Sequence, residues 1–309
     1  MGKEIRILVG PEGDGKALRE ILRAAAVSSS ALQRAKKAER GILLDGRPVF
    51  VSAIAREGQT VILKQPERAE QSLLPVQGEL RIAYEDEDLL VLNKPPRLSA
   101  HPGPGNKSES LANFVAAYLQ ARGEAPVFRG VNRLDRTTSG LLAAAKHAHA
   151  QHFLAAQLRD GRFKRRYLGL FCGEPGFDER EIDAPIARKP GSALAREVRE
   201  GGAPAKTRLR VLRRGEGLHL GLFELESGRT HQIRVHMAHL GLPLLGDFLY
   251  GQEIEGQRCM LHAALLRCER LSGGELRLFS PPPEDFCRVA GKMGIEIGSW
   301  MEEELWRPL

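Results

Sequence analysis

The chain has 309 residues, 42% of them hydrophobic and 28% charged, which is ordinary for a globular protein and sufficient for one large and one small domain. The formal net charge of +7 favours a polyanionic partner, either nucleic acid or an acidic membrane surface. No apolar run approaches the roughly 20 residues of a membrane helix, and Glu4 and Arg6 stand where a signal peptide needs an apolar core. We therefore expect neither a membrane span nor a signal peptide.

The cysteine pattern points to a reducing compartment. The four cysteines are widely spaced and include no Cys-x-x-Cys pair: Cys172, Cys259, Cys268 and Cys287. This spacing argues against a zinc site and against the disulfide framework of a secreted protein. We expect a cytoplasmic protein.

Residues 1–65 predict a small unit that begins with two helices. Apolar residues at helical spacing follow a glycine turn and predict the first helix: Leu18, Ile21, Leu22 and Ala25. Ser28-Ser29-Ser30 offers an N-cap to a second helix over residues 31–38. That helix carries three basic residues, which in isolation would indicate a solvated helix face: Arg34, Lys36 and Lys37.

A compact hairpin unit completes this small domain. A strand over residues 42–44 meets an Asp45-Gly46 turn of hairpin type, residues 49–51 follow, and a last strand covers residues 61–63. Residues 66–79 are rich in proline and charge, with little periodicity, and we predict a linker there.

The large domain, residues 80–309, opens with two strands, 80–84 and 89–92, joined by an acidic turn. The prolines that follow stop the sheet, because proline cannot donate to a strand ladder. Taken alone, Lys94 and Arg97 in this stretch are loop charges. Next comes an amphipathic helix that Ser108 caps and Gly123 ends, with one apolar stripe facing the core: Leu111, Phe114, Val115, Tyr118 and Leu119.

Asp135 stands among basic and hydroxyl residues, directly before an apolar run. A carboxylate between Arg133 and Arg136 should stay ionised, because opposite charge nearby favours its charged form. The simplest interpretation is a helix-capping aspartate or a surface ion pair. A functional interpretation needs further support.

A second amphipathic helix follows over residues 148–158, with three histidines near its start: His147, His149 and His152. They include no i,i+4 pair with a neighbouring carboxylate, so we expect surface or capping residues and no metal site.

Two further strands and a helix complete the ordered pattern. Residues 164–171 alternate like a strand, in which Tyr167 alone would be a half-buried sheet aromatic. Residues 218–226 form another strand. Residues 230–240 predict a helix that ends at Gly241, with Ile233 packed inside.

Several of these stretches together resemble one family. Arg133-Leu134-Asp135 followed by Thr138-Ser139-Gly140 resembles the catalytic signature of the RluA-type RNA pseudouridine synthases, although Asn132 stands where that signature usually begins with His. Arg165-Arg166-Tyr167-Leu168 resembles the strand that supplies the family's tyrosine, and the run Gly228 to His236 is the longest match. The resemblance extends over residues 80–287.

This resemblance implies an α+β pseudouridine synthase fold, with a mixed, mainly antiparallel central sheet flanked by helices and an RNA-binding cleft. It implies that Asp135 is catalytic, that Tyr167 stacks on the target uracil and helps remove its C5 proton, and that Arg234 pairs with Asp135. Further basic residues are expected to contact RNA: Arg133, Arg136, Arg165, Arg229, Arg34, Lys36 and Lys37. The target base must be extruded from RNA structure, and Arg133 is the candidate to fill its place. An isomerisation needs no redox cofactor, nucleotide or metal, and we expect none.

Residues 1–65 are similar to the alpha-L RNA-binding module of a small-subunit ribosomal protein and many RNA-modifying enzymes, on Ser30-Ala31-Leu32-Gln33 and Leu44 to Val49. Such a module is commoner in members that act on large-subunit ribosomal RNA, so we expect ribosomal RNA before transfer RNA as substrate. We also expect a monomer that does not bind membranes. A non-catalytic RNA-binding or ribosome-assembly protein and a metal-dependent nuclease are the alternatives.

Overall fold

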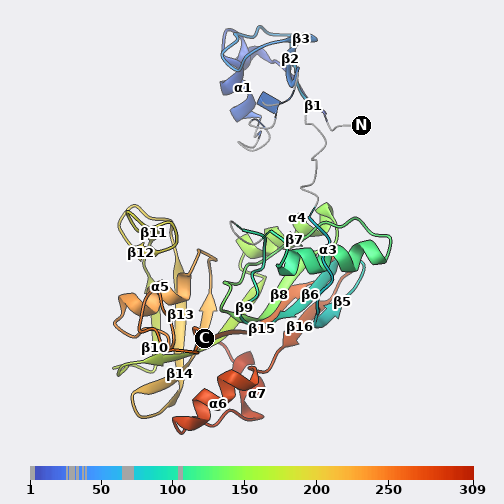
Figure 1. Cartoon of the computed structure of the whole chain (residues 1–309). Coiled ribbons are helices and arrows are strands. Elements are labelled where there is room, and N and C mark those ends of the chain that lie inside the picture. The colour runs from blue at the N-terminus through green and yellow to red at the C-terminus, as the bar shows by residue number, and fades with distance from the viewer. Residues whose placement is uncertain are drawn as a thin grey trace. The chain divides into compact units, whose positions relative to one another are not determined.

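The computed structural model describes residues 4–25, 27, 32, 35–36, 38, 40–64, 73–103 and 107–309. The chain divides into two compact units, residues 1–72 and residues 73–309 (Figure 1). Within the described ranges, no helix combines the length and the apolar character that crossing a membrane requires.

The smaller unit is built on a four-stranded antiparallel sheet in the order β1-β4-β2-β3. Its elements are β1 (Glu4–Leu8), η1 (Pro11–Gly13), α1 (Leu18–Ala24), β2 (Ile42–Leu44), β3 (Arg47–Pro48) and β4 (Thr60–Lys64). Leu18 and Leu22 of α1 share a buried cluster with Ile42, Val61 and Leu63 of the sheet. The predicted first helix and the strands near residues 42–44 and 61–63 are therefore confirmed.

Other expectations for this unit need correction. The strand after the Asp45-Gly46 turn is β3 at residues 47–48 and not 49–51, because both turn residues have positive φ and pairing resumes at once, Leu44 opposite Arg47. The sequence did not predict β1, whose partner β4 lies more than fifty residues away in the chain. Half of the predicted helix over residues 31–38 lies outside the described residues, namely residues 31, 33, 34 and 37.

The larger unit contains a ten-stranded sheet. Its main path runs β10-β13-β14-β9-β15-β8-β6-β5, while β16 pairs with β15 and β7 pairs with β8. The strands are β5 (Ile82–Glu85), β6 (Leu89–Lys94), β7 (Arg129–Gly130), β8 (Ser139–Ala145), β9 (Lys164–Cys172), β10 (Glu179–Asp183), β13 (Lys206–Arg214), β14 (Leu218–Leu225), β15 (Leu261–Glu269) and β16 (Glu275–Phe279). A separate hairpin consists of β11 (Ile186–Arg188) and β12 (Arg196–Val198). β8 and β15 run parallel and the other pairs run antiparallel, so the predicted α+β class with a mixed, mainly antiparallel sheet is confirmed.

Helices cover both faces of this sheet. They are α3 (Leu111–Ala121), α4 (Ala148–Arg159), α5 (Gln232–His239), α6 (Glu284–Lys292) and α7 (Trp300–Trp306). Leu111 of α3 and Ile233 of α5 join Tyr167 of β9 in one buried cluster, while Leu168 joins residues of α6 and α7 in another. Because neighbouring strand residues point to opposite faces, Tyr167 faces the α3–α5 side. The C-terminal helices α6 and α7 lie together, drawn in red in Figure 1.

Details of the ends of elements differ from prediction. The N-cap of α3 is Ser110 and not Ser108, and its hydroxyl forms a reciprocal capping box with Asn113. Part of the expected linker packs on the larger unit, since the Leu74 carbonyl accepts a hydrogen bond from the Asn113 side chain.

The loop that carries Asp135 leads into the buried strand β8 and not into a helix. Asp135 is therefore not a helix cap. Gly140, near the start of β8, has φ of 106°, and a Cβ there would lie 2.2 Å from the Ala263 carbonyl oxygen of β15. Glycine thus permits the close parallel approach of β8 and β15 just beyond the Asp135 loop.

Candidate active site

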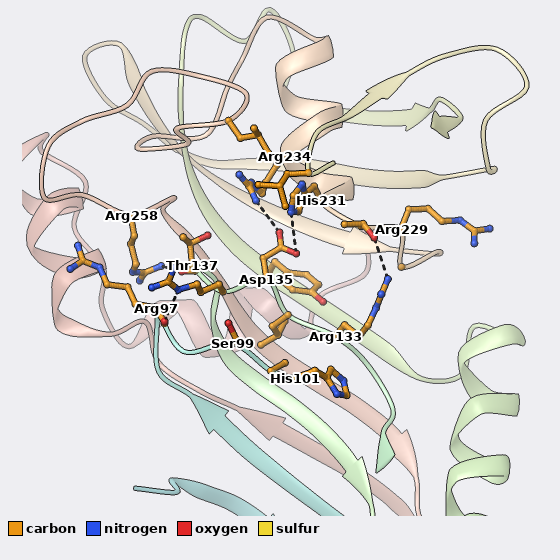
Figure 2. A pocket seen from close by; sticks show the side chains of 18 of the residues that line it. Arg97, Ser99, His101, Arg133, Asp135, Thr137, Arg229, His231, Arg234 and Arg258 are labelled. Atoms are coloured by element: carbon orange, nitrogen blue, oxygen red, sulfur yellow. Dashed lines mark hydrogen bonds and ion pairs between the residues drawn. The ribbon is translucent and has the colours of Figure 1, made fainter. Parts of the chain in front are cut away.

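A pocket of about 690 Å³ opens above the middle of the sheet, around Asp135 (Figure 2). It is lined by the loop after β6, the Asp135 loop, β9, the start of α5, and the segments around residues 248–249 and 257–258. Of the described residues that line it, seven are arginines and one, Asp135, is acidic. Figure 2 shows Arg133 and Arg229 on one flank of Asp135, and Arg97 and Arg258 on the other.

Arg234 of α5 binds Asp135. Its Nη1 donates to Asp135 Oδ2 at 3.3 Å, so two groups 99 residues apart in the chain meet at the pocket. Arg234 is 3% exposed, whereas Asp135 is 23% exposed and reachable from the pocket. An arginine keeps its proton at any physiological pH, so Asp135 faces a permanent positive charge.

Asp247 holds Arg234 in place, and no sequence pattern singled out this residue. Arg234 Nε and Nη2 donate to its two oxygens at 2.8 and 2.7 Å. Burial by itself would lower the pKa of Arg234, but the hydrogen bonds and charge of Asp247 outweigh it and raise that pKa. Asp247 is fully buried and also accepts backbone N–H groups from Leu249 and Tyr250. The available signal was the Gly246-Asp247 pair directly after an apolar run.

Two buried basic residues, Lys94 and Arg258, hold the backbone of the Asp135 loop. Lys94, at the end of β6, is 0% exposed and donates to the carbonyl oxygens of Pro95, Leu98 and Arg136 at 2.9, 2.9 and 3.3 Å. Lys94 is therefore a buried structural residue and not the loop charge that it would be when taken alone. Burial lowers its pKa to about 7.

Arg258 is the second of these basic residues. Its Nη1 donates to the Thr137 carbonyl at 3.2 Å, while its Nε donates to Asp285 at 2.7 Å. The loop backbone on the C-terminal side of Asp135 is thus held at two successive carbonyls, those of Arg136 and Thr137. No sequence pattern indicated this role of Arg258.

Side chains also hold both ends of the loop against the sheet. Asn132 accepts a hydrogen bond from the Ala143 N–H at 2.8 Å and donates to the Leu141 carbonyl at 3.4 Å, so it takes the place of a strand neighbour beside β8. Ser139 and His262 Nδ1 are 2.9 Å apart, and His262 Nε2 lies 2.9 Å from the Ser280 carbonyl. Burial lowers the pKa of His262 to about 4, so this link contains a neutral imidazole at pH 7.

Tyr167 lines the pocket from β9 and is 4% exposed. Burial raises the pKa of its hydroxyl, with the Asp135 charge acting in the same direction and Arg165 opposing. The phenol is therefore protonated at neutral pH. Its ring offers a flat surface to the pocket.

The arginines expected to contact RNA in the large domain all line this pocket: Arg133, Arg136, Arg165 and Arg229. Arg133 is exposed, with a 3.4 Å hydrogen bond to Thr230, and Arg136 donates to the Arg97 carbonyl at 3.1 Å. Arg165 is buried. In the smaller unit, Lys36 is exposed, whereas Arg34 and Lys37 lie outside the described residues.

Of the three histidines near the start of α4, His149 and His152 are exposed and His147 caps the helix. His147 is the N-cap of α4, since its Nδ1 accepts the Ala150 N–H, and its Nε2 lies 2.8 Å from Asp88. The expected capping role is thus confirmed for His147. Among the described residues, no three or more His, Cys, Asp or Glu side chains form a group that could hold a metal ion.

The chain is similar in sequence and in structure to RNA pseudouridine synthases. The family model for RNA pseudouridylate synthases matches residues 88–239. The uncharacterized RNA pseudouridine synthase YjbO of Bacillus subtilis is 38% identical over 250 residues, covering 80% of this chain and 88% of that protein. The ribosomal large subunit pseudouridine synthase D of Haemophilus ducreyi is 36% identical, covering 72% of this chain and 74% of that protein. The solved structure of human RNA pseudouridylate synthase domain containing 1 is similar with a TM-score of 0.60 and 26% identity, covering 74% of this chain and 96% of that one.

Proposed function

Because the chain belongs to the RluA-type family of RNA pseudouridine synthases, it is an isomerase that converts uridine to pseudouridine in RNA, and we propose that Asp135 is the carboxylate on which this reaction depends. The observation that carries the proposal is the placement of Asp135. It is the acidic group among the described lining residues of an arginine-rich pocket, and it is held by a buried arginine that is itself fixed by Asp247.

The reaction breaks the N1–C1′ bond of uridine, turns the uracil, joins C5 to C1′ and moves the C5 proton to solvent while N1 takes one up. A carboxylate can serve it either by attacking C1′ or by abstracting a proton from the neighbouring sugar carbon. Both routes require the ionised form. Arg234 holds Asp135 through Oδ2 and leaves Oδ1 without this contact.

The target base must leave its stack before C1′ can reach Asp135, at a cost of a few kcal/mol. Tyr167 offers the face on which the extruded uracil would stack, and its protonated hydroxyl would relay a proton during loss of the C5 proton. Arg133 is exposed at the flank of the pocket, where it would fill the vacated place or clamp the RNA backbone. The other lining arginines, Arg136, Arg165 and Arg229, would hold phosphates near the site.

For the substrate we propose large-subunit ribosomal RNA. Several relatives carry the name ribosomal large subunit pseudouridine synthase D, among them those of Haemophilus ducreyi and Pasteurella multocida. The proposed alpha-L character of residues 1–65, with linker residues 66–79 before the catalytic domain 80–309, agrees with a large structured RNA as the target. We further propose that the protein works as a monomer in the cytoplasm, which size-exclusion chromatography with light scattering and cell fractionation would test.

Tritium release tests the reaction and its substrate together. RNA labelled at C5 of uridine would be prepared as ribosomal and transfer RNA from cells lacking the enzyme, and EDTA would be present throughout. Wild type should release tritium from ribosomal RNA, and Asp135→Asn should release none while binding the RNA within a few-fold of wild type. Release from transfer RNA alone would overturn the substrate proposal, and undiminished release by Asp135→Asn would overturn the role of Asp135.

A further inference from the structure

Asp135 has a second neighbour besides Arg234. His231 Nε2 lies 3.9 Å from Asp135 Oδ1, the oxygen that Arg234 does not bind (Figure 2). This separation is too long for a direct hydrogen bond. The two atoms therefore face each other across a gap at the wall of the pocket, which both residues line.

The partners of His231 determine which of its nitrogens carries the proton. Its Nδ1 lies 2.7 Å from the Tyr250 hydroxyl, and that hydroxyl accepts the Arg196 backbone N–H at 2.8 Å. With an acceptor site of the hydroxyl used by Arg196, its own hydrogen is free to go to Nδ1. A neutral imidazole that accepts at Nδ1 is protonated at Nε2. The opposite tautomer would point a lone pair at the Asp135 carboxylate and leave the hydroxyl hydrogen of Tyr250 unused.

His231 is also held in an uncommon backbone conformation. It precedes α5 as the N-cap residue with φ of 59° and ψ of 21°, the left-handed region that few residues other than glycine adopt. The following Gln232 is fixed by four hydrogen bonds, with Ser227, Arg229, Lys206 and Thr207. Burial lowers the pKa of His231, with the Asp135 charge opposing, so the imidazole facing the gap is neutral at pH 7. An uncommon conformation at a pocket wall is a frequent mark of a functional position.

The gap has defined chemistry. One side offers a hydrogen-bond donor, Nε2–H, and the other offers an acceptor, Oδ1. An oxygen about 2.8 Å from each can bridge them from beside the line that joins them. A group that both accepts and donates is a hydroxyl, whereas phosphate and carbonyl oxygens only accept. Within an RNA chain the 3′ and 5′ oxygens of each ribose are esterified, so the 2′-hydroxyl is the sugar hydroxyl available. It sits on the carbon next to C1′, the atom at which Asp135 is proposed to act.

We propose that His231 and Asp135 Oδ1 together form a binding site for the ribose 2′-hydroxyl of the target uridine, with His231 as donor and Asp135 as acceptor. This inference rests on the proposed role of Asp135. The site fixes the sugar of the extruded nucleotide against the carboxylate, and it gives the enzyme a contact that DNA cannot make.

A double-mutant cycle, in which one change is made in the protein and the other in the substrate, tests the proposal. Single-turnover rates would be measured for wild type and His231→Asn on an RNA whose target nucleotide is uridine or 2′-deoxyuridine. Asparagine tolerates the left-handed conformation but lacks the imidazole donor. On wild type, removing the hydroxyl should slow the reaction about ten- to hundredfold. On His231→Asn, the all-ribose RNA should react about that much more slowly, and the further loss from removing the hydroxyl should be smaller than about threefold.

If removing the 2′-hydroxyl slowed wild type and His231→Asn by the same factor, the proposed site would be overturned. If wild type does not turn over the 2′-deoxy substrate at all, the same cycle in dissociation constants, measured in an Asp135→Asn background that retains an acceptor oxygen, decides the question by the same criterion. Failure of the proposed function is distinguishable, because wild type would then release no tritium from all-ribose RNA.

Tyr250→Phe tests the assigned tautomer, since it removes the hydroxyl that directs the His231 proton and keeps the ring. It should lose most of the same discrimination against 2′-deoxyuridine. Tyr118→Phe is the matched control, because it removes a hydroxyl bound to a carboxylate, Glu85 at 2.6 Å, that does not line this pocket. It should leave rate and discrimination unchanged. Full discrimination in Tyr250→Phe would contradict the tautomer on which the site depends.

Discussion

Arg234 makes two short hydrogen bonds to Asp247, at 2.8 and 2.7 Å, and a single longer one, at 3.3 Å, to Asp135. The guanidinium is thus anchored by the carboxylate that lies away from the pocket opening and presents its remaining nitrogen to the one that is accessible. Arg234 therefore orients Asp135 through one carboxylate oxygen, Oδ2. The other oxygen, Oδ1, has no partner within hydrogen-bond distance among the described residues. If Asp135 has the proposed role, Asp247 would serve the reaction by fixing the position of Arg234.

Replacing Asp247 should impair both the reaction and the fold. Asp247→Asn leaves the charge of Arg234 buried without a counter-charge on that side, which we expect to lower the free energy of unfolding by about 3 kcal/mol. Because the guanidinium would shift relative to Asp135, we expect the single-turnover rate to fall about a hundredfold. Urea denaturation and tritium release measure the two effects.

Asp178→Asn is the control for the loss of an ion pair as such. Asp178 is 87% exposed and pairs with Arg214 at 2.7 Å, so its replacement should cost less than about 1 kcal/mol and leave the rate unchanged. A normal rate in folded Asp247→Asn would show that Asp135 does not depend on the position of Arg234.

Tyr167→Phe separates the stacking surface from the hydroxyl. The ring remains, so we expect RNA affinity within a few-fold of wild type. Loss of the protonated hydroxyl should slow the single-turnover rate by about tenfold or more, as loss of a proton-transferring group does. Tyr167→Leu should in addition weaken binding of RNA. Full activity of Tyr167→Phe would remove the hydroxyl from the reaction.

His262 should make stability depend on pH in the acidic range. Its pKa is lowered to about 4 in the folded protein and is about 6.5 in the unfolded chain, so between these values the unfolded chain binds more protons. Stability contributed by neutral His262 is therefore present above pH 6.5 and is lost as the pH falls towards 4, by about 3 kcal/mol over the full window.

Urea denaturation of wild type and His262→Gln between pH 7 and pH 4.5 checks this expectation. The variant should be less stable at pH 7, because Ser139 and the Ser280 carbonyl lose a partner, and the difference between the two proteins should shrink as the pH falls. His149→Gln, at an exposed position, should follow wild type throughout. A constant difference between wild type and His262→Gln at all pH values would contradict the assigned neutral state.

Removing the smaller unit should change how salt affects RNA binding. If residues 1–72 contact phosphates, deleting them should weaken binding and make the slope of log affinity against log salt concentration shallower, because fewer counterions are released. Filter binding at several potassium chloride concentrations measures the slope. An unchanged slope with residues 73–309 alone would show that the smaller unit does not bind the RNA backbone.

Local sequence patterns predicted most of the helices and strands, but few of the contacts that hold the Asp135 loop in place. The hairpin of β5 and β6, the strands β9 and β14 and the helix α4 follow from alternation, helical spacing and turn residues that lie close in the chain. The resemblance of short motifs led to the pairing of Asp135 with Arg234. The burial of Lys94 could not be predicted, because its acceptor on Arg136 lies 42 residues away and only the folded loop brings the two together.

The contacts of Arg258 could not be predicted for a similar reason. Its distant partners are the Thr137 carbonyl, 121 residues away, and Asp285, 27 residues away, and neither is marked by a periodic pattern. A lone arginine in a loop has the same sequence appearance whether it is solvated or buried. Functional groups that work through backbone carbonyls leave little trace in residue types, since every residue offers the same acceptor.

The order of strands in the large sheet indicates which strands can unfold locally without disturbing the pocket. Tyr167 lies on β9 and the Asp135 loop ends in β8, and both strands are neighbours of β15, with β10 and β5 at the two margins. Sub-global unfolding that begins at exposed margins can proceed through β10 or β5 while these three central strands stay paired. Amide hydrogens of β8, β9 and β15 should accordingly exchange with solvent last, and Tyr167 and the Asp135 loop would stay together in molecules whose margins are transiently open.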